Sequence, residues 1–250
     1  MKLSIIVPAH NEEARIGRML EAYLPYFTEH YAADVEVIVV LNACIDGTER
    51  VVSEFATKFP CLRWIEEARP GKGQALMTGF GAAEGELIGF TDADGSTPPQ
   101  AFQDLADRIG DAGCIIASRW RNDSIVSPRQ PLDRRIASRC FNLMVRILFG
   151  LRLTDTQCGA KLIRREPLRA VLPCLGLTRW AFDVDLLFQL RRQGHRTIET
   201  ATEWHDVAGS KIDVMHSSID MFCALTRLRL LYSPFKGIVT VYNKLLKIST

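Results

Sequence analysis

Residues 3–91 alternate short apolar runs with helical patterns, and this order limits the possible folds more than any other feature of the chain. Strands are expected at residues 3–7, 36–41, 62–65 and 87–91, and helices at residues 12–31, 48–59 and 73–83. Strands that alternate with helices in this way form a mostly parallel sheet with helices on both faces. The sequence therefore predicts a Rossmann-like α/β fold.

Polar loops follow all four predicted strands, at the point where each strand ends. They read PAHNEE from Pro8, LNACIDGT from Leu41, EARPGKG from Glu67 and TDADGST from Thr91. In open α/β sheets, ligands bind in the crevice beyond the carboxyl ends of the strands. We therefore expect these four loops to line one binding site.

The composition fits one large domain or two closely joined halves. The chain has 250 residues, of which 47% are hydrophobic, and a formal net charge of +2, so we expect a sizeable core and no nucleic-acid partner. Its seven scattered cysteines include no C-x-x-C pair, which favours reduced core residues over disulfides or a zinc site. Residues 1–8 do not resemble a signal peptide, and no apolar run approaches the roughly 18 residues that span a bilayer. We expect a cytoplasmic protein that is not integral to a membrane.

Two carboxylates, Asp92 and Asp94, stand one residue apart directly after the fourth predicted strand. Hard divalent ions take oxygen ligands and commonly share them with phosphates, so D-A-D at a strand end fits a clamp for a metal and a diphosphate. Helix capping is the alternative, since Asp, Ser96 and Thr97 all suit the turn before a helix that begins near Pro98. A lone D-x-D pattern is weak, and these residues alone leave both interpretations open.

The chain becomes strongly basic after Ser118. Residues 119–146 hold two acidic residues, Asp123 and Asp133, against seven arginines: Arg119, Arg121, Arg129, Arg134, Arg135, Arg139 and Arg146. A loop with two prolines and an amphipathic helix are expected there, followed by a helix at residues 182–194, a strand at 197–204 and a last helix toward Tyr232. An arginine-rich segment with its own helix therefore follows the acidic strand end.

Motifs spread over nearly the whole chain resemble those of the family 2 glycosyltransferases, which have the GT-A fold. IIVPAHNEE, GKGQALMTGF and FTDADG resemble the family's opening strand and loop, its next nucleotide-side loop and its metal motif. DTQCGAKLIRR, FDVDLL and EWHDVAGSKI resemble the polyprenyl-phosphate branch, which contains the dolichyl-phosphate glucosyltransferases and mannose synthases. DADG followed later by W-x-D-x-x-GSK resembles the glucosyl side of that branch. The resemblance implies one GT-A domain over residues 1–250, with a nucleotide-sugar half at 1–118 and an acceptor half at 119–250 that ends in a basic helix and tail.

The resemblance also implies a donor site that binds a nucleotide sugar with Mg²⁺ or Mn²⁺. Asp92 and Asp94 would hold the metal, and the other implied donor-side residues are Pro8, His10, Glu12, Asn42, Lys72, Ala93 and Lys211. Leu41 to Cys44 departs from the family's usual Asp-Asp-Gly-Ser run, although the Asn42 side-chain oxygen can still accept a hydrogen bond from a base, without charge. His10 stands where many relatives have Tyr, and its ring either stacks on the base or is an ordinary hydrogen-bonded surface residue.

On the acceptor side, the implied reaction needs positive charge more than a strong base, because a phosphate monoester is already an anion at neutral pH. The candidates to bind this phosphate are Arg119, Arg134 or Arg135, and Lys211, with a solvated helix face as the alternative for each arginine. Asp155 and Gln157 resemble the family's acceptor loop, and Asp183 or Asp185 stands where relatives carry a carboxylate near the sugar. Asp155 can instead start a turn, Asp183 can cap a helix, and Trp180 and Trp204 can be core aromatics. The implied catalytic set is Asp94, Asp155, Arg119 and Arg135.

The resulting hypothesis is an inverting transfer of a hexose, glucose first and mannose second, from a donor of the UDP-glucose or GDP-mannose class to a polyprenyl phosphate. No Ser/His/Asp order and no P-loop supports a covalent hydrolase or an ATPase. A soluble sugar acceptor is the first alternative. A sugar nucleotidyltransferase lacks its Gly-rich loop here, and a non-catalytic binding module would have little use for both aspartates. The hexose, the base, the exact lipid and the oligomeric state stay open at this point.

The C-terminal residues predict a peripheral contact with the cytoplasmic membrane face. After Asp220 the chain has no acidic residue, and apolar residues alternate with Arg227, Arg229, Lys236, Lys244 and Lys247. Such a tail suits an anionic lipid surface, where each basic residue contributes about 1 kcal/mol. A core-packed helix with a solvated basic edge is the alternative, above all for residues 221–231.

Overall fold

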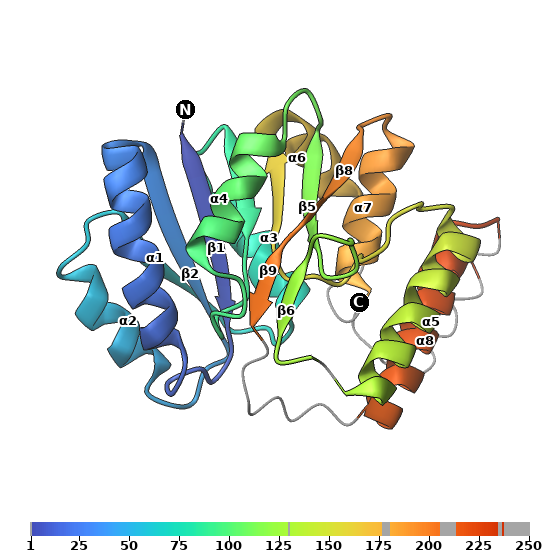
Figure 1. The fold of residues 1–250 in the computed structure, drawn as a ribbon, viewed down its shortest axis with the longest axis horizontal. Helices are drawn as coiled ribbons and strands as arrows, with labels where there is room; N and C mark the ends of the chain where they lie inside the picture. The colour runs from blue at the N-terminus through green and yellow to red at the C-terminus, as the bar shows by residue number, and fades with distance from the viewer. Residues whose placement is uncertain (1, 130, 177–180, 206–213, 235–236, 238–250) are drawn as a thin grey trace.

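A seven-stranded, mostly parallel sheet runs through the centre of the protein (Figure 1). The computed structural model describes residues 2–129, 131–176, 181–205, 214–234 and 237. Within the sheet, the strand at 161–164 runs antiparallel to both of its neighbours, whereas the other paired strands are parallel. In spatial order the strands are β3 (Leu62–Glu67), β2 (Val35–Asn42), β1 (Leu3–Ala9), β4 (Leu87–Phe90), β7 (Lys161–Arg164), β5 (Cys114–Ser118) and β8 (Thr197–Ala201).

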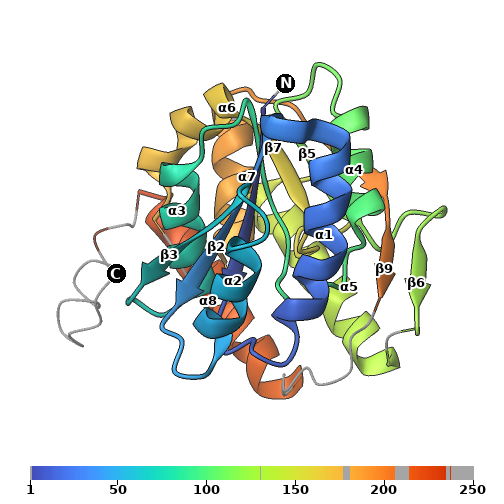
Figure 2. The ribbon, with the colours of Figure 1, turned by 90° about the vertical axis from the view of Figure 1, so that its left-hand side faces the viewer.

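Helices cover both faces of this sheet (Figure 2). In β1, Ile5 and Val7 belong to one core and Ile6 to the other, because successive side chains of a strand point to opposite faces. The first core is covered by α1 (Ile16–Tyr31), α2 (Thr48–Ala56) and α4 (Pro99–Arg108). The second is covered by α3 (Lys72–Ala82), α6 (Arg165–Val171) and α7 (Phe182–Arg192), and short 3-10 helices lie at Ala32–Asp34 and Leu172–Cys174. Because both faces are covered, the strands are nearly continuous apolar runs.

Two further helices, α5 (Leu132–Phe149) and α8 (Val214–Leu231), pack against each other beside the sheet (Figure 1). Phe141 and Val145 of α5, and Leu225 and Leu228 of α8, join the second core. α5 ends at Gly150, whose φ of 64° is a left-handed conformation that glycine adopts without steric cost. Within the described residues, none of the helices combines the length and the apolar character needed to cross a bilayer.

The strand predicted at residues 197–204 is in fact two strands in two sheets. β8 ends at Ala201, whereas β9 (Glu203–His205) pairs in parallel with β6 (Ile125–Ser127) in a separate two-stranded sheet. Thr202 marks the change, since its carbonyl accepts a hydrogen bond from the Ile125 N–H at 3.0 Å. The prediction failed because residues 197–204 contain no Gly, Pro, Asn or Asp that would signal a break between two strands.

The predicted α/β fold with helices on both faces is confirmed, and the first four strands lie where the sequence predicts them. The helix predicted at 12–31 begins four residues later, because the N–H groups of Arg15 and Ile16 both donate to the Glu12 carbonyl at 2.9 Å and close a turn first. The antiparallel direction of β7 was not predicted. β7 belongs to the C-terminal half of the chain but lies between β4 and β5, so the two halves interlock within one sheet.

This topology gathers six strand ends and one strand start at a single edge of the sheet. The parallel strands β1 to β5 and β8 all end there, and the antiparallel β7 begins there, with its first residue, Lys161, paired with Phe90 at the end of β4. The loops after these strands, and the loop that leads into β7, therefore meet at one place.

Candidate functional site

Asn42 joins the loops after β1, β2 and β3 through hydrogen bonds. Its Oδ1 accepts a hydrogen bond from the Gly71 N–H at 2.7 Å, and its Nδ2 donates to the Arg69 carbonyl at 2.7 Å. Gly71, which donates this bond, has a φ of 133°, a conformation that other residues rarely adopt. The His10 ring nitrogen Nδ1 lies 2.6 Å from the Asn42 backbone oxygen. Asn42 is buried and stabilises these loops, and its binding of a base stays a prediction.

Asp92 lies directly after β4, and its carboxylate is held between Lys72 and Gly159. The Lys72 Nζ is 2.6 Å from Asp92 Oδ1, and both side chains are 37% exposed. A Cβ on Gly159 would lie 1.9 Å from Asp92 Oδ2, so this position has no room for a side chain. Burial raises the pKa of Asp92, but the charges of Lys72, Lys161 and Arg119 outweigh burial and hold that pKa below its usual value. Asp92 is therefore a fixed anion surrounded by cations.

Asp94 shapes the turn after Asp92 and does not cap the following helix. Its Oδ1 accepts a hydrogen bond from the Ser96 N–H at 2.9 Å, whereas the N-cap residue of α4 is Pro98 and no described side chain caps that helix. The helix-capping interpretation of the two aspartates, Ser96 and Thr97 is therefore wrong. Ala93, between the aspartates, is buried. The second oxygen of Asp94 and the exposed part of Asp92 are left to bind a ligand.

Asp92 and Asp94 fit a divalent cation whose remaining ligands are oxygen atoms of a bound substrate. Glu12 lies near both aspartates, and its pKa is raised above the usual value. Burial raises this pKa most, and the charges of Asp94 and Asp92 raise it further. Arg15, which donates two hydrogen bonds of 2.6 Å to Glu12, lowers it by less. In the part of the chain that the structure describes, no three His, Cys, Asp or Glu side chains form a cluster that could hold a metal. Mg²⁺ and related ions are commonly bound by one or two carboxylates and substrate phosphates, and Asp92 with Asp94 matches that chemistry.

Directly after β5, Arg119 forms an ion pair with Asp155. The Arg119 Nε and Nη2 donate to the two Asp155 oxygens at 2.8 and 2.9 Å, and the Arg119 backbone N–H donates to the same carboxylate at 3.0 Å. The Asp155 side chain is fully buried, and that of Arg119 is 14% exposed. Burial raises the pKa of Asp155, but the adjacent Arg119 outweighs burial and lowers it. The pair therefore stays ionised, and Asp155 fixes one edge of the guanidinium.

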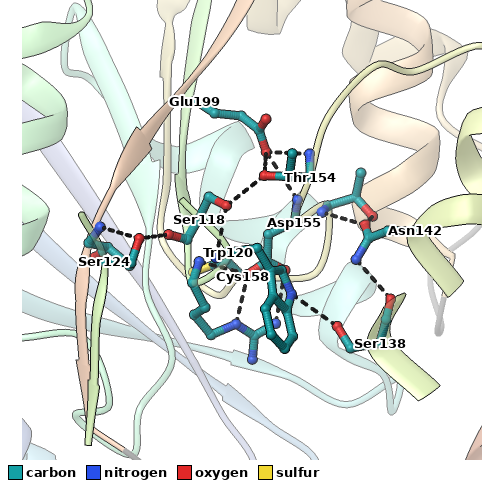
Figure 3. A network of polar contacts seen from close by, with 12 residues as sticks. Ser118, Trp120, Ser124, Ser138, Asn142, Thr154, Asp155, Cys158 and Glu199 are labelled. Atoms are coloured by element: carbon teal, nitrogen blue, oxygen red, sulfur yellow. Dashed lines mark hydrogen bonds and ion pairs between the residues drawn. The ribbon is translucent and has the colours of Figure 1, made fainter. Parts of the chain in front are cut away.

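A hydrogen-bond network holds the loop that carries Asp155 (Figure 3). Glu199 on β8 accepts from the N–H groups of Thr154 and Asp155 at 2.7 and 3.0 Å, and from the Thr154 hydroxyl at 3.0 Å. Asn142 on α5 accepts from the Thr156 N–H and hydroxyl, both at 3.0 Å. Asp155 thus does more than start a turn, and its catalytic role stays a prediction.

Lys161 is a fully buried cation at the start of β7. Its Nζ donates to Asp183 Oδ1 at 2.7 Å, and Asp183 is also close enough to raise the pKa of Lys72 by its charge. Asp185 differs, since it accepts from the Tyr232 hydroxyl at 2.8 Å, at the end of α8. Of the two aspartates of α7, Asp183 is therefore the one that lies near Lys161 and Lys72. Its interpretation as a helix cap is wrong, because the N-cap residue of α7 is Ala181 and Asp183 lies inside the first turn.

The structure leaves the roles of five further predicted residues untested. Arg135 is exposed in the first turn of α5, where its backbone N–H donates to the Pro131 carbonyl at 3.1 Å and its side chain bonds to no other described residue; Arg134 is half-buried. Pro8 is half-buried near the end of β1. Lys211 and Trp180 lie outside the described residues. The roles of these five residues stay predictions.

Sequence reasoning missed Lys161, Gly159 and Glu199. A signal existed for Lys161, because a single lysine that opens an apolar run needs a buried partner. Gly159 and Glu199 act on residues that are distant in sequence, so their spacing carried no signal. Trp204 is buried as expected for a core aromatic, but its ring also contacts the Arg119 guanidinium.

Comparisons with known proteins show which family and which fold the chain resembles. The family described as glycosyl transferase family 2 matches residues 4–172. Dolichyl-phosphate beta-glucosyltransferases of Dictyostelium discoideum, Drosophila melanogaster and Homo sapiens are 32%, 34% and 31% identical, over 92%, 88% and 92% of this chain and 74%, 72% and 76% of their own. The crystal structure of glucosyl-3-phosphoglycerate synthase from Mycobacterium tuberculosis with Mn²⁺ and UDP-glucose has a TM-score of 0.69 and 19% identity, covering 91% of this chain and 78% of that one. This last likeness is one of fold.

Proposed function

The chain belongs to glycosyl transferase family 2, and on this premise we propose that it transfers a hexose from a nucleoside diphosphate sugar to a polyprenyl phosphate. Glucose is the first candidate and mannose the second, with a donor of the UDP-glucose or GDP-mannose class. The names of the relatives support a lipid phosphate as acceptor. The observation that carries the proposal is that the cations Lys72, Arg119 and Lys161 surround Asp92. A transfer between two substrates that both carry phosphate needs positive charge to bind them.

On the donor side, Asp92 and Asp94 would hold Mg²⁺ or Mn²⁺. When bound, such an ion neutralises the charge that develops on the departing nucleoside diphosphate. Lys72 would donate to a diphosphate oxygen from its place beside Asp92. Burial lowers the pKa of Lys72, but the charges of Asp92, Asp183 and Asp94 outweigh burial and raise it, so the ammonium group stays charged at neutral pH.

On the acceptor side, Arg119 would bind the attacking phosphate. Asp155 takes its Nε and Nη2, which leaves Nη1 to donate to a ligand. Among the described residues the buried Gln157 Nε2 has no hydrogen-bond partner, and it can supply a further donor. Arg135 and Lys211 would add positive charge.

The reaction is a single displacement that needs no strong base. An oxygen of the acceptor phosphate forms a bond to the anomeric carbon as the bond from that carbon to the diphosphate oxygen breaks, and the nucleoside diphosphate leaves with the electron pair. The acceptor is already an anion, so no proton has to be removed. An α-linked donor then gives a β-linked product.

The acceptor's hydrocarbon chain requires contact with a membrane, and we expect a peripheral contact at the cytoplasmic face. α5 supports this expectation with a stripe of apolar side chains that are 55–72% exposed: Leu132, Ile136, Leu143 and Ile147. The helix also carries four arginines against one acidic residue: Arg134, Arg135, Arg139 and Arg146 against Asp133. An apolar stripe bordered by basic residues suits an anionic lipid surface.

The C-terminal part of the membrane hypothesis stays a prediction. Arg229 is exposed on α8 and Arg227 is half-buried, as a helix packed on the core with a basic edge would have them. Lys236, Lys244 and Lys247 lie outside the described residues.

The products of turnover test the proposal against its alternatives. The protein is incubated with Mn²⁺ and radiolabelled UDP-glucose or GDP-mannose, and with either a short polyprenyl phosphate or phosphoglyceric acid, which is bound in a solved structure of the same fold. Lipid-bound hexose with release of a nucleoside diphosphate is the expected result. Transfer to the soluble compound alone would contradict the lipid acceptor, and release of inorganic diphosphate would indicate nucleotidyl transfer. Absence of any metal-dependent turnover would favour a binding module.

A further inference from the structure

Trp204 lies on a short strand that is bonded to the loop of the two aspartates. The neighbouring His205 N–H donates to the Ser96 carbonyl at 2.7 Å, and the Ser96 N–H donates to Asp94 Oδ1 at 2.9 Å. β9 pairs with β6 on its other side, with Trp204 in register with Val126. The strand that carries Trp204 therefore has a fixed position relative to Asp94.

The same residue contacts Arg119. The Arg119 Cζ is 5.2 Å from the centre of a Trp204 ring, and Trp204 is 8% exposed. Asp155 holds one edge of the guanidinium through two hydrogen bonds, and these alone let its plane rock about that edge. An aromatic face against the guanidinium attracts the cation and restricts this rocking.

We propose that Trp204 is a positioning residue. It fixes the orientation of the Arg119 guanidinium and, through β9, the position of that guanidinium relative to Asp94. The inference rests on the proposed function, since it assumes that Arg119 binds the acceptor phosphate. A tryptophan that only fills the core could be replaced by any apolar side chain of sufficient size. A residue that positions a cation needs an aromatic face.

The first test compares Trp204→Phe, which keeps an aromatic face, with Trp204→Leu, which keeps only apolar volume. Trp204→Leu should raise the KM for polyprenyl phosphate about tenfold, or about 1.4 kcal/mol, and Trp204→Phe by less than about threefold. Both variants should bind UDP-glucose with Mn²⁺ as the wild type does, measured by thermal shift. Trp64→Leu, on the edge strand β3, controls for the loss of an indole. An unchanged KM in Trp204→Leu, or equal losses in both Trp204 variants, would overturn the inference.

A second test does not depend on activity. A double-mutant cycle joins Trp204→Leu with Arg119→Met and measures urea unfolding, where the two changes should couple by about fivefold in the unfolding constant. Absence of coupling would overturn the inference whatever the activity. If the two changes couple but the protein transfers no hexose to polyprenyl phosphate, the proposed acceptor is wrong and the contact between Trp204 and Arg119 still stands. If Trp204→Leu does not fold, Trp204→Met replaces it in both tests.

Discussion

Replacing Gly159 with alanine should displace the Asp92 carboxylate while leaving the sheet intact. The added Cβ would lie 1.9 Å from Asp92 Oδ2, 2.5 Å from Cγ and 3.1 Å from Oδ1, whereas ordinary contacts are 3.4–4 Å. The difference between 3.4 and 1.9 Å means that Oδ2 must move by about 1.5 Å. The carboxylate is the far end of a side chain and can rotate, so it moves before the backbone does.

Lys72 determines the energetic cost of that rotation. Its Nζ is 2.6 Å from Asp92 Oδ1, and both side chains are 37% exposed, so solvent screens the pair and its loss costs at most about 1 kcal/mol of stability. The effect on the reaction is larger, because a displacement of about 1 Å at a reacting site can cost about 100-fold. We expect turnover to fall about 100-fold and donor affinity about tenfold.

Gly81→Ala is the matched control. Outside its own helix, no described residue lies within 4 Å of a Cβ built on Gly81, and in a helix alanine is favoured over glycine by up to about 1 kcal/mol. Thermal shift with UDP-glucose and Mn²⁺ measures donor binding, urea unfolding measures stability, and radiolabelled transfer measures turnover. If Gly159→Ala binds the donor and turns over like Gly81→Ala, the fixed placement of Asp92 is not what the site requires.

Four further predictions concern the metal, the stereochemistry, the membrane and pH. Asp94→Asn should unfold at the wild-type temperature but lose the metal-dependent thermal shift with UDP-glucose and most turnover; normal turnover in EDTA would contradict the metal clamp. An α-linked donor should give a β-linked lipid product by NMR of the anomeric proton, and an α product would exclude a single displacement. The wild type should float with anionic liposomes at low salt but not with neutral ones, and the double variant Ile136→Lys, Ile147→Lys should not float, because charge on the apolar stripe opposes its insertion; equal flotation of both proteins would exclude α5 as the contact. Hydrogen bonds from Arg69 hold the pKa of Glu67 at about 2, below the usual 4.5, so the stabilisation by this carboxylate is complete above pH 4.5 and is lost as the pH falls toward 2. The difference in stability between wild type and Glu67→Gln should therefore shrink over that window in urea unfolding, and a constant difference from pH 6 to 2 would contradict this.

The N-terminal half of the fold could be predicted from the sequence because its signals are local. Each of the strands β1 to β4 is a short apolar run followed by a polar loop, and parallel pairing follows from the helices between them. The direction of β7 could not be predicted in this way. It depends on the path of the chain through α5, and nothing in the residues Lys161 to Arg164 distinguishes a parallel from an antiparallel strand.

The candidate site shows the same division between local and distant signals. Asp92 and Asp94 could be singled out because two carboxylates at the end of an apolar strand are unusual. The partners that define their environment come from elsewhere in the chain: Lys161 enters from β7, and Gly159 closes on Asp92 from a loop that is remote in sequence. Spacing along the chain carries no information about such approaches, which only the folded sheet creates.

The place of β7 between β4 and β5 also has a consequence for synthesis on the ribosome. β5 is complete at Ser118, but the strand that joins it to β4 is complete only at Arg164. A nascent chain that has not yet released β7 therefore exposes an unpaired edge of β4, and such edges promote aggregation and chaperone binding. The first 118 residues cannot close their own sheet, so we expect that a fragment cut there will not fold as an independent nucleotide-binding unit.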